Sequence, residues 1–390
     1  MKKSILLLIY EFVPLGDARI IRWANLSRYL ADNNYDVSIL TTEFSECDRS
    51  LDASLIDIVN HPNIEIHRIV QRSCHSTRPE IFSWLRKAYV AVRELTSKKS
   101  YDVLLSSALP IFPNLVASLV KRNRHIPLWF ADYGDPWSTS RTIGQGPMKK
   151  FVEQILEREA LRVADGLILT TPLAKDIFYP VYNRPDDIHI IPNGASYFHL
   201  SADWTSKHRI LSEDDDLVIL YTGSFYRTRE PNKLFDGLSQ VEHVHLHVVG
   251  RHRMDVETIA KDCNVQSKIT LQPYTEQDRI VEMQQEADVL LLTSWPVPEQ
   301  ISGKIYEYLR TNKPILYVTD HEDDLAAQIL REHDAAQYIC PHQPEAIASM
   351  LSQIRNDAVH GNLPVRNPVH IHGFDSRADQ LMQLIERSTV

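Results

Sequence analysis

Residues 298–316 read PEQISGKIYEYLRTNKPIL, and this stretch decides the fold of the second half of the chain. Two glutamates, Glu299 and Glu307, are separated by seven residues, with the turn Ser302–Lys304 between them. Short apolar runs at 289–292 and 315–318 flank the segment and predict two buried strands. The segment therefore predicts a strand, a loop, a short helix and a second strand.

The turn at the start of that helix is suited to an anion. Ser302 is the expected N-cap, and the first free backbone N–H groups of the helix would point outward. Gly303 lets a phosphate approach the backbone, and Lys304 adds positive charge. Each glutamate would then accept hydrogen bonds from hydroxyl groups on either side of the phosphate. A sugar, a diphosphate and a ribose in a row have this chemistry.

Length and composition allow two soluble domains. The chain has 390 residues, a length that allows two domains of about 150 to 200 residues each. Its residues are 43% hydrophobic and 24% charged, as in ordinary globular proteins. The net charge of −9 gives no reason to expect general nucleic-acid binding. The four cysteines form no CxxC pair, so we expect no disulfide framework and a cytoplasmic location.

The N-terminus, MKKSILLLIYEF, resembles a signal peptide only superficially, because its apolar run from Ile5 to Tyr10 is too short for one. We expect a buried first strand there. No apolar run approaches about 18 residues, so no transmembrane helix is expected.

Short apolar runs alternate with stretches of helical periodicity along the whole chain, which is typical of parallel sheets covered on both faces. Strands are expected at 5–9, 37–41, 64–69, 103–106, 128–131, 167–169, 188–191, 218–221, 245–249, 269–271, 289–292, 315–318 and 337–339. The polar, acidic stretch after residue 200 predicts a junction. We expect an N-terminal Rossmann-like domain over 1–200, a second over 201–370, and a helix in 371–390 that packs back on the first. The fold class is α/β, with two doubly wound domains facing an interdomain cleft.

Several segments, in order, resemble those of the retaining glycosyltransferases of family 4, which have the GT-B fold. The glutamate pair followed by EYLRTNKPIL is one. The others are HIIPNGAS (189–196), YTGSFYRTREPNK (221–233), HVVGRHR (247–253), ADVLLLTS (287–294) and FADYGDPWS (130–138). The last of these is similar to members that assemble polysaccharides.

The resemblance implies roles for matching positions. On the donor side, Glu299 would contact the transferred sugar and Glu307 the ribose, while Arg227 or Arg229, with Lys233, would neutralise the diphosphate. Gly223 would leave room for the phosphate beside Ser224. On the acceptor side, the candidates are Asp135, the weaker Asp132, and Gly16, Asp17 and Arg19 of the first loop. We class Glu299, Asp135, Arg227 and Lys233 as catalytic, and Glu307, Gly223, Ser224, Arg229, Ser302, Gly303 and Lys304 as donor-binding.

The expected activity is transfer of a sugar from a nucleotide-diphosphate sugar to a hydroxyl acceptor, a surface polysaccharide or lipid-linked saccharide, with no cofactor or metal. Gly16-Asp17 replaces the Gly-Gly turn that many members carry, and the common N-terminal histidine has no counterpart. The alternatives are a sugar-nucleotide epimerase of the same fold and an inactive binding subunit of a transferase complex. A Rossmann dehydrogenase lacks its GxGxxG sequence here.

Two further patterns suggest binding. One face of a predicted strand would carry His243, His245 and His247. These histidines are expected to be ordinary strand residues, and a zinc site is the less favoured interpretation. The stretch 80–99 (EIFSWLRKAYVAVRELTSKK) is amphipathic and basic. It predicts either a helix packed on the core or an interfacial helix at the inner face of a membrane.

Overall fold

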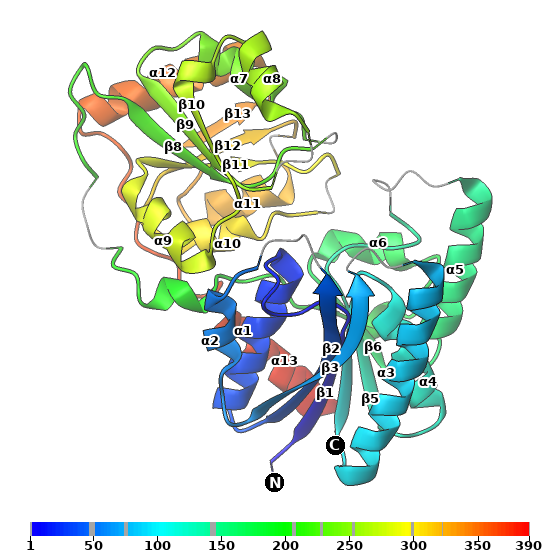
Figure 1. The fold of residues 1–390 in the computed structure, drawn as a ribbon. Coiled ribbons are helices and arrows are strands. Elements are labelled where there is room, and N and C mark those ends of the chain that lie inside the picture. Colours follow the sequence, from blue (N-terminus) through cyan, green and yellow to red (C-terminus); the bar gives the residue numbers. More distant parts are fainter. Residues whose placement is uncertain are drawn as a thin grey trace. The chain divides into compact units, whose positions relative to one another are not determined.

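The chain forms two α/β units (Figure 1). The structure is a computed structural model that describes residues 2–46, 51–73, 77–140, 146–204, 208–226, 229–251, 254–297, 300–321 and 323–389. Unit 1 comprises Met1–Asn193 and Phe374–Val390, and unit 2 comprises Gly194–Gly373. The chain therefore passes from one unit to the other twice, at Asn193–Gly194 and at Gly373–Phe374.

Unit 1 is built on a seven-stranded parallel sheet of order β3-β2-β1-β4-β5-β6-β7. Its strands are β1 (Ser4–Ile9), β2 (Asp36–Glu46), β3 (Ile64–Ser73), β4 (Val103–Ala108), β5 (Leu128–Tyr133), β6 (Gly166–Leu169) and β7 (Ile188–Ile190). Its helices are α1 (Ala18–Asp32), α2 (Ser54–Val59), α3 (Arg78–Lys98), α4 (Phe112–Arg122), α5 (Pro147–Leu161), α6 (Lys175–Phe178) and α13 (Phe374–Ser388).

The helices of unit 1 cover both faces of its sheet. Side chains of α3, α4 and α5, among them Trp84, Val116 and Leu161, form one core with the strands. On the other side α1 packs beside α2 and α13 (Figure 1). The last helix thus joins the N-terminal unit, where the Arg377 Nε donates to the carbonyl of Asn193 at 3.3 Å.

Unit 2 has a six-stranded parallel sheet of order β10-β9-β8-β11-β12-β13. Its strands are β8 (Leu217–Thr222), β9 (Val244–Val249), β10 (Ile269–Gln272), β11 (Val289–Thr293), β12 (Ile315–Thr319) and β13 (Tyr338–Pro341). Its helices are α7 (Asn232–Ser239), α8 (Val256–Asp262), α9 (Gln277–Glu286), α10 (Lys304–Leu309), α11 (Leu325–Glu332) and α12 (Pro344–Val359). Helices α7, α8 and α12 share one core with the sheet, and α9, α10 and α11 share the other.

The prediction of two doubly wound parallel-sheet domains is confirmed. In each sheet the strand order reverses next to the first strand, between β1 and β4 in unit 1 and between β8 and β11 in unit 2. Loops at the carboxyl ends of strands at such a reversal are where α/β folds bind ligands. No helix in the described ranges is long and apolar enough to cross a membrane.

Candidate functional site

The predicted donor-binding residues gather at the strand-order reversal of unit 2. Gly223 and Ser224 directly follow β8, Ser302 and Gly303 lie between β11 and α10, and Lys304 is the first residue of α10. Strands β8 and β11 are hydrogen-bonded neighbours, although about 70 residues separate them in the sequence. Because the strands are parallel, their carboxyl ends lie side by side. The two loops therefore meet at the carboxyl-terminal end of the sheet.

Two glycines let the loops after β8 and β9 approach each other closely. A Cβ atom on Gly250 would lie 2.3 Å from the Gly223 carbonyl oxygen, and a Cβ on Gly223 would lie 2.6 Å from Cζ of Tyr221. Neither position has room for a side chain. The Ser224 Oγ accepts a hydrogen bond from the Arg251 backbone N–H at 3.1 Å, which fastens the two loops together.

The Tyr221 hydroxyl lies between two cationic side chains. Arg229 Nη1 donates to it at 3.4 Å, and the Arg229 guanidinium stacks 4.4 Å from the centre of the Trp295 ring. Burial would raise the pKa of the Tyr221 phenol, but Arg229 and Lys304 together lower it. Burial, together with Arg229, lowers the pKa of Lys304.

These two cations have no carboxylate partner within ion-pair distance among the residues that the structure describes. Two positive charges side by side repel each other, and partial burial strengthens the repulsion. Glu307 acts on Lys304 beyond ion-pair distance, so these loops offer a net positive charge at the place where a ligand would bind.

Glu307, on the first turn of α10, adds an acceptor beside this charge. It is half-buried, and burial raises its pKa to about 7, with Lys304 and the side chain of Gln277 opposing the shift. A carboxyl group that ionises near neutral pH accepts hydrogen bonds from vicinal hydroxyls when ionised. The arrangement is suited to a ribose next to a phosphate.

The beginning of α10 differs from the prediction. The N-cap is Gly303 rather than Ser302, and it makes no side-chain capping bond. Instead the Ser302 carbonyl accepts from the Ile305 N–H at 3.1 Å, and the helix has only six residues. The predicted helix is therefore present but begins at Lys304, which belongs to its first turn.

A pocket lies against the same loops, over the carboxyl ends of β8, β11, β12 and β13. Its walls include Phe225, Arg229, Thr293, Ser294, Val318 and His342. Lys233 is exposed on α7, one residue before Leu234 of the pocket wall. Arg227 and Glu299 lie outside the described residues.

In unit 1, Asp132 has a structural role that the sequence did not reveal. It is buried, and its two oxygens accept from Arg22 Nη2 and Trp23 Nε1, each at 3.0 Å. Arg22 also donates to the carbonyls of Pro192 and Ile191, at 2.8 and 3.0 Å. Asp132 thus fastens α1 and the end of unit 1 to β5, and its carboxylate is turned away from solvent.

The other acceptor-side candidates differ in their contacts and exposure. The Asp17 side chain caps α1 by accepting from the N–H groups of Arg19 and Ile20, and the Arg19 guanidinium contacts Glu11 at 3.0 Å. Gly16 directly precedes this cap. Asp135 is exposed in the loop after β5.

A buried carboxylate holds the loop that carries Asp135. The Ser138 N–H donates to Glu157 Oε2 at 3.2 Å, and the Ser138 hydroxyl donates to the same oxygen. Burial raises the pKa of Glu157, with Ser138 and Tyr133 opposing the shift. Glu157 was not predicted from sequence, because a glutamate on a helix carries no sign of pointing inward.

The strand histidines are satisfied within the sheet. His245 and His247 on β9 bond to Thr270 and Gln272 at 2.8 and 3.1 Å, whereas His243 precedes the strand in a left-handed conformation. No cluster of three or more metal-ligating side chains occurs in the described part of the chain.

Comparison with known families agrees with this architecture. Residues 21–194 match the family described as "Glycosyl transferase 4-like domain", and residues 203–364 match "Glycosyl transferases group 1". The chain belongs to the glycosyltransferases of the GT-B fold. Among curated proteins, no sequence relative matches it.

Solved structures of low sequence identity share the fold of this glycosyltransferase over nearly its whole length. Sucrose-phosphate synthase from Thermosynechococcus elongatus is 17% identical, with 99% of each chain covered and a TM-score of 0.72. Anabaena HepE, solved in complex with UDP and glucose, is 14% identical, with 99% of this chain and 100% of that one covered and a TM-score of 0.67. A UDP-N-acetylglucosamine 2-epimerase is 16% identical, with coverage of 100% and 98% and a TM-score of 0.59.

The site thus contains residues that the glycosyltransferase resemblance had not marked. Tyr221, Gly250, Gln277 and Trp295 all contact or constrain predicted positions. Tyr221 and Gly250 lie within the resembling segments 221–233 and 247–253, although neither was given a role. Gln277 and Trp295 lie outside those segments, and their part in the site depends on the folded arrangement.

Proposed function

We propose that this glycosyltransferase is a retaining, family-4 type enzyme that moves a sugar from a nucleotide-diphosphate sugar to a hydroxyl acceptor, a surface polysaccharide or a lipid-linked saccharide. The observation that carries the proposal is the pair of cations Arg229 and Lys304 acting on Tyr221, for which the described residues offer no carboxylate within ion-pair distance. A diphosphate supplies the missing negative charge. Glu307 lies next to this position and accepts from the ribose hydroxyls.

The reaction needs stabilisation of the leaving group. As the bond from the anomeric carbon to the β-phosphate oxygen breaks, negative charge builds on that phosphate. Arg229 and Lys304, with Arg227 and Lys233 as the predicted partners, hold this charge in a preorganised site without a metal. Removing one such donor typically slows the reaction about 100- to 1000-fold.

The acceptor hydroxyl attacks the same carbon from the side of the leaving phosphate. A bond forms between the anomeric carbon and the acceptor oxygen, and the hydroxyl proton passes to the departing phosphate. Glu299 contacts the transferred sugar in this scheme, and Asp135 lies on the acceptor side. Glu157 serves as a positioning residue, because it holds the Asp135 loop through Ser138.

A transfer assay tests the proposal. The purified chain is incubated with radiolabelled nucleotide sugars, with and without EDTA, and with membrane extracts or simple glycosides as acceptors. We expect release of nucleoside diphosphate coupled to labelled product, with EDTA without effect, and a loss of about 100-fold or more in Arg229→Ala. The matched control is Arg331→Ala, which removes an exposed arginine paired with Asp323 on the surface of the same unit.

Other outcomes would identify the rival functions. An epimerised nucleotide sugar formed without any acceptor would indicate an epimerase. Nucleotide binding with neither hydrolysis nor transfer would indicate a binding subunit. A strict requirement for a divalent cation would contradict the proposed charge stabilisation.

A further inference from the structure

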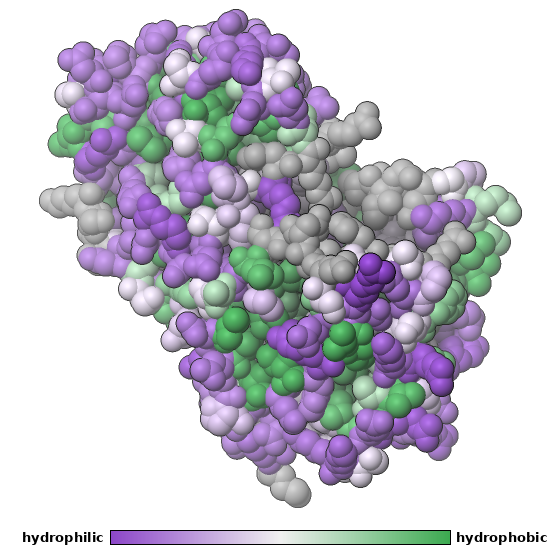
Figure 2. Space-filling view, in the orientation of Figure 1, coloured by the Kyte–Doolittle hydropathy of each residue, from purple (hydrophilic) through white to green (hydrophobic). Residues whose placement is uncertain are grey.

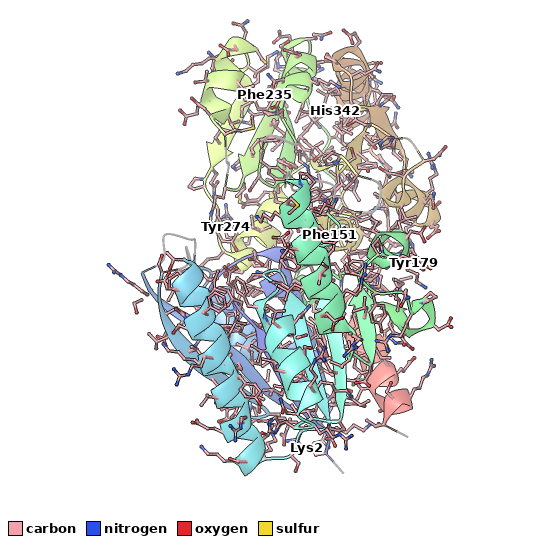
Figure 3. The ribbon with its side chains drawn as sticks, turned by 90° about the vertical axis from the view of Figure 1, so that its right-hand side faces the viewer. Lys2, Phe151, Tyr179, Phe235, Tyr274 and His342 are labelled. Atoms are coloured by element: carbon pink, nitrogen blue, oxygen red, sulfur yellow. The ribbon has the colours of Figure 1, made fainter. Side chains whose placement is uncertain are left out.

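Helix α5 carries its apolar residues on the outside. Five large hydrophobic side chains lie three and four positions apart along one stripe and are exposed: Met148 (77%), Phe151 (60%), Val152 (59%), Ile155 (45%) and Leu156 (44%). Figure 3 views the molecule from this side, with α5 in front and Phe151 labelled on it. Figure 2 shows hydrophobic side chains along the edge where α5 runs in Figure 1.

The rotation of this helix is fixed by its inner face. Glu157, Ala160 and Leu161 are buried, and Glu157 binds Ser138 of the preceding loop. On one flank the Arg158 guanidinium donates to the Pro180 carbonyl at 2.7 Å. If the helix turned its apolar stripe inward, it would break the hydrogen bonds of Glu157 and Arg158. These bonds therefore keep the stripe facing outward.

Basic residues accompany the stripe. The first turn contains Lys149 and Lys150 and no acidic residue; the Lys149 side chain is 66% exposed and its Nζ lies 3.7 Å from Oε1 of Glu153. Arg158 lies on the last turn and Arg162 directly follows the helix; both are exposed, and Arg162 Nε lies 3.8 Å from Oε2 of Glu159. An apolar stripe flanked by lysines and arginines is the surface that binds at the headgroup boundary of an anionic bilayer.

The size of the patch favours a lipid surface over a second copy of the chain. Five partly exposed side chains of this kind present on the order of 500 Å² of apolar surface. A stable protein dimer buries about 800 Å² on each partner. An interfacial helix needs only a stripe of this width.

We propose that the outward face of α5 is the membrane-docking surface of this protein. This inference rests on the proposed function, since it gives a location to the membrane contact expected of an enzyme with a lipid-linked acceptor. For 80–99 the sequence had left a core-packed and an interfacial helix open. In α3, Trp84, Ala88 and Val92 are buried in the core, and Phe82 is exposed without a continuous stripe.

Vesicle flotation tests the surface independently of transfer. The full chain is mixed with vesicles of phosphatidylcholine alone and of phosphatidylcholine with an equal amount of phosphatidylglycerol. We expect binding to the anionic vesicles that weakens about tenfold in Phe151→Ser and further in Phe151→Ser/Ile155→Ser. Lys149→Ser should weaken binding about fivefold, on anionic vesicles only. The matched control Phe82→Ser, which removes an exposed phenylalanine of α3, should bind like the wild type.

Several results would overturn the proposal. One is absence of wild-type binding to either vesicle, and another is equal binding by wild type and Phe151→Ser. A concentration-dependent dimer that Phe151→Ser dissociates, seen by sedimentation velocity, would assign the face to a second copy. Nucleotide affinity of each variant is measured in parallel. A vesicle-binding loss with unchanged nucleotide affinity separates failure of docking from failure of the donor site.

Discussion

Replacing Gly250 by alanine tests the geometry of the donor site most sharply. The new Cβ would lie 2.3 Å from the Gly223 carbonyl oxygen and 2.7 Å from its carbonyl carbon. Ordinary van der Waals contact begins near 3.4 Å, so the loop after β8 must retreat by about 1 Å. Both obstructing atoms belong to the backbone and cannot rotate away.

The expected effect follows from the size of that displacement. A misplacement of about 1 Å near a reacting centre costs about 100-fold in rate, or about 2.7 kcal/mol of transition-state stabilisation. We expect kcat/KM for donor turnover to fall by about this factor and nucleotide affinity to weaken. Steady-state kinetics and calorimetry measure both, and the calorimetric stoichiometry reports the folded fraction.

The matched control is Gly146→Ala, at the N-cap of α5, where a Cβ meets nothing within 4 Å. It should retain wild-type kinetics. If Gly250→Ala were as active as Gly146→Ala, the close approach of the two loops would have no part in donor binding, and the site would need to be placed elsewhere.

Two further predictions concern Glu307 and Asp132. Because the Glu307 pKa is raised to about 7, the ionised fraction rises from about one tenth at pH 6 to about nine tenths at pH 8. Affinity for a nucleotide sugar, whose diphosphate does not titrate in this range, should rise up to about tenfold between pH 6 and pH 8. The variant Glu307→Gln should show no such rise. A wild-type affinity that does not change with pH would contradict the assignment of Glu307 to the ribose. Asp132→Ala leaves Arg22 buried without its partner and should cost about 3 to 5 kcal/mol in urea unfolding. The nucleotide affinity of the folded Asp132→Ala protein should stay unchanged. A free energy of unfolding within about 1 kcal/mol of the wild type would show that the buried pair Arg22–Asp132 does not stabilise unit 1.

Much of the fold was predictable because parallel sheets covered on both faces have short apolar strands. The run ILLLI became β1, and LVILY became β8, each with the predicted position. Strand ends were less certain, as in β2, which continues to Glu46. Those extra residues depend on pairing with β3, which a local pattern does not report.

The site was only partly predictable, because its chemistry depends on pairs far apart in sequence. Glu307 and Lys304 belong to one recognisable segment, but the electrostatic interaction of Lys304 with Tyr221 and Arg229 requires β8 and β11 to be neighbours. The structural role of Asp132 was hidden for the same reason, since its partner Arg22 lies on α1. For 80–99 both a core-packed and an interfacial helix stayed open, because an amphipathic pattern does not tell which face the core will take; α3 does pack on the core.

The central claim is that unit 2 binds a nucleoside diphosphate through Glu307 and the adjacent cations. The most direct test is calorimetric titration of UDP, GDP, ADP and CDP into the wild type, Glu307→Ala and the surface control Arg331→Ala. We predict that one nucleotide binds the wild type and the control equally and binds Glu307→Ala at least about tenfold more weakly. Equal affinity of that nucleotide for the wild type and Glu307→Ala, or no binding of any nucleotide to the wild type, would contradict the account.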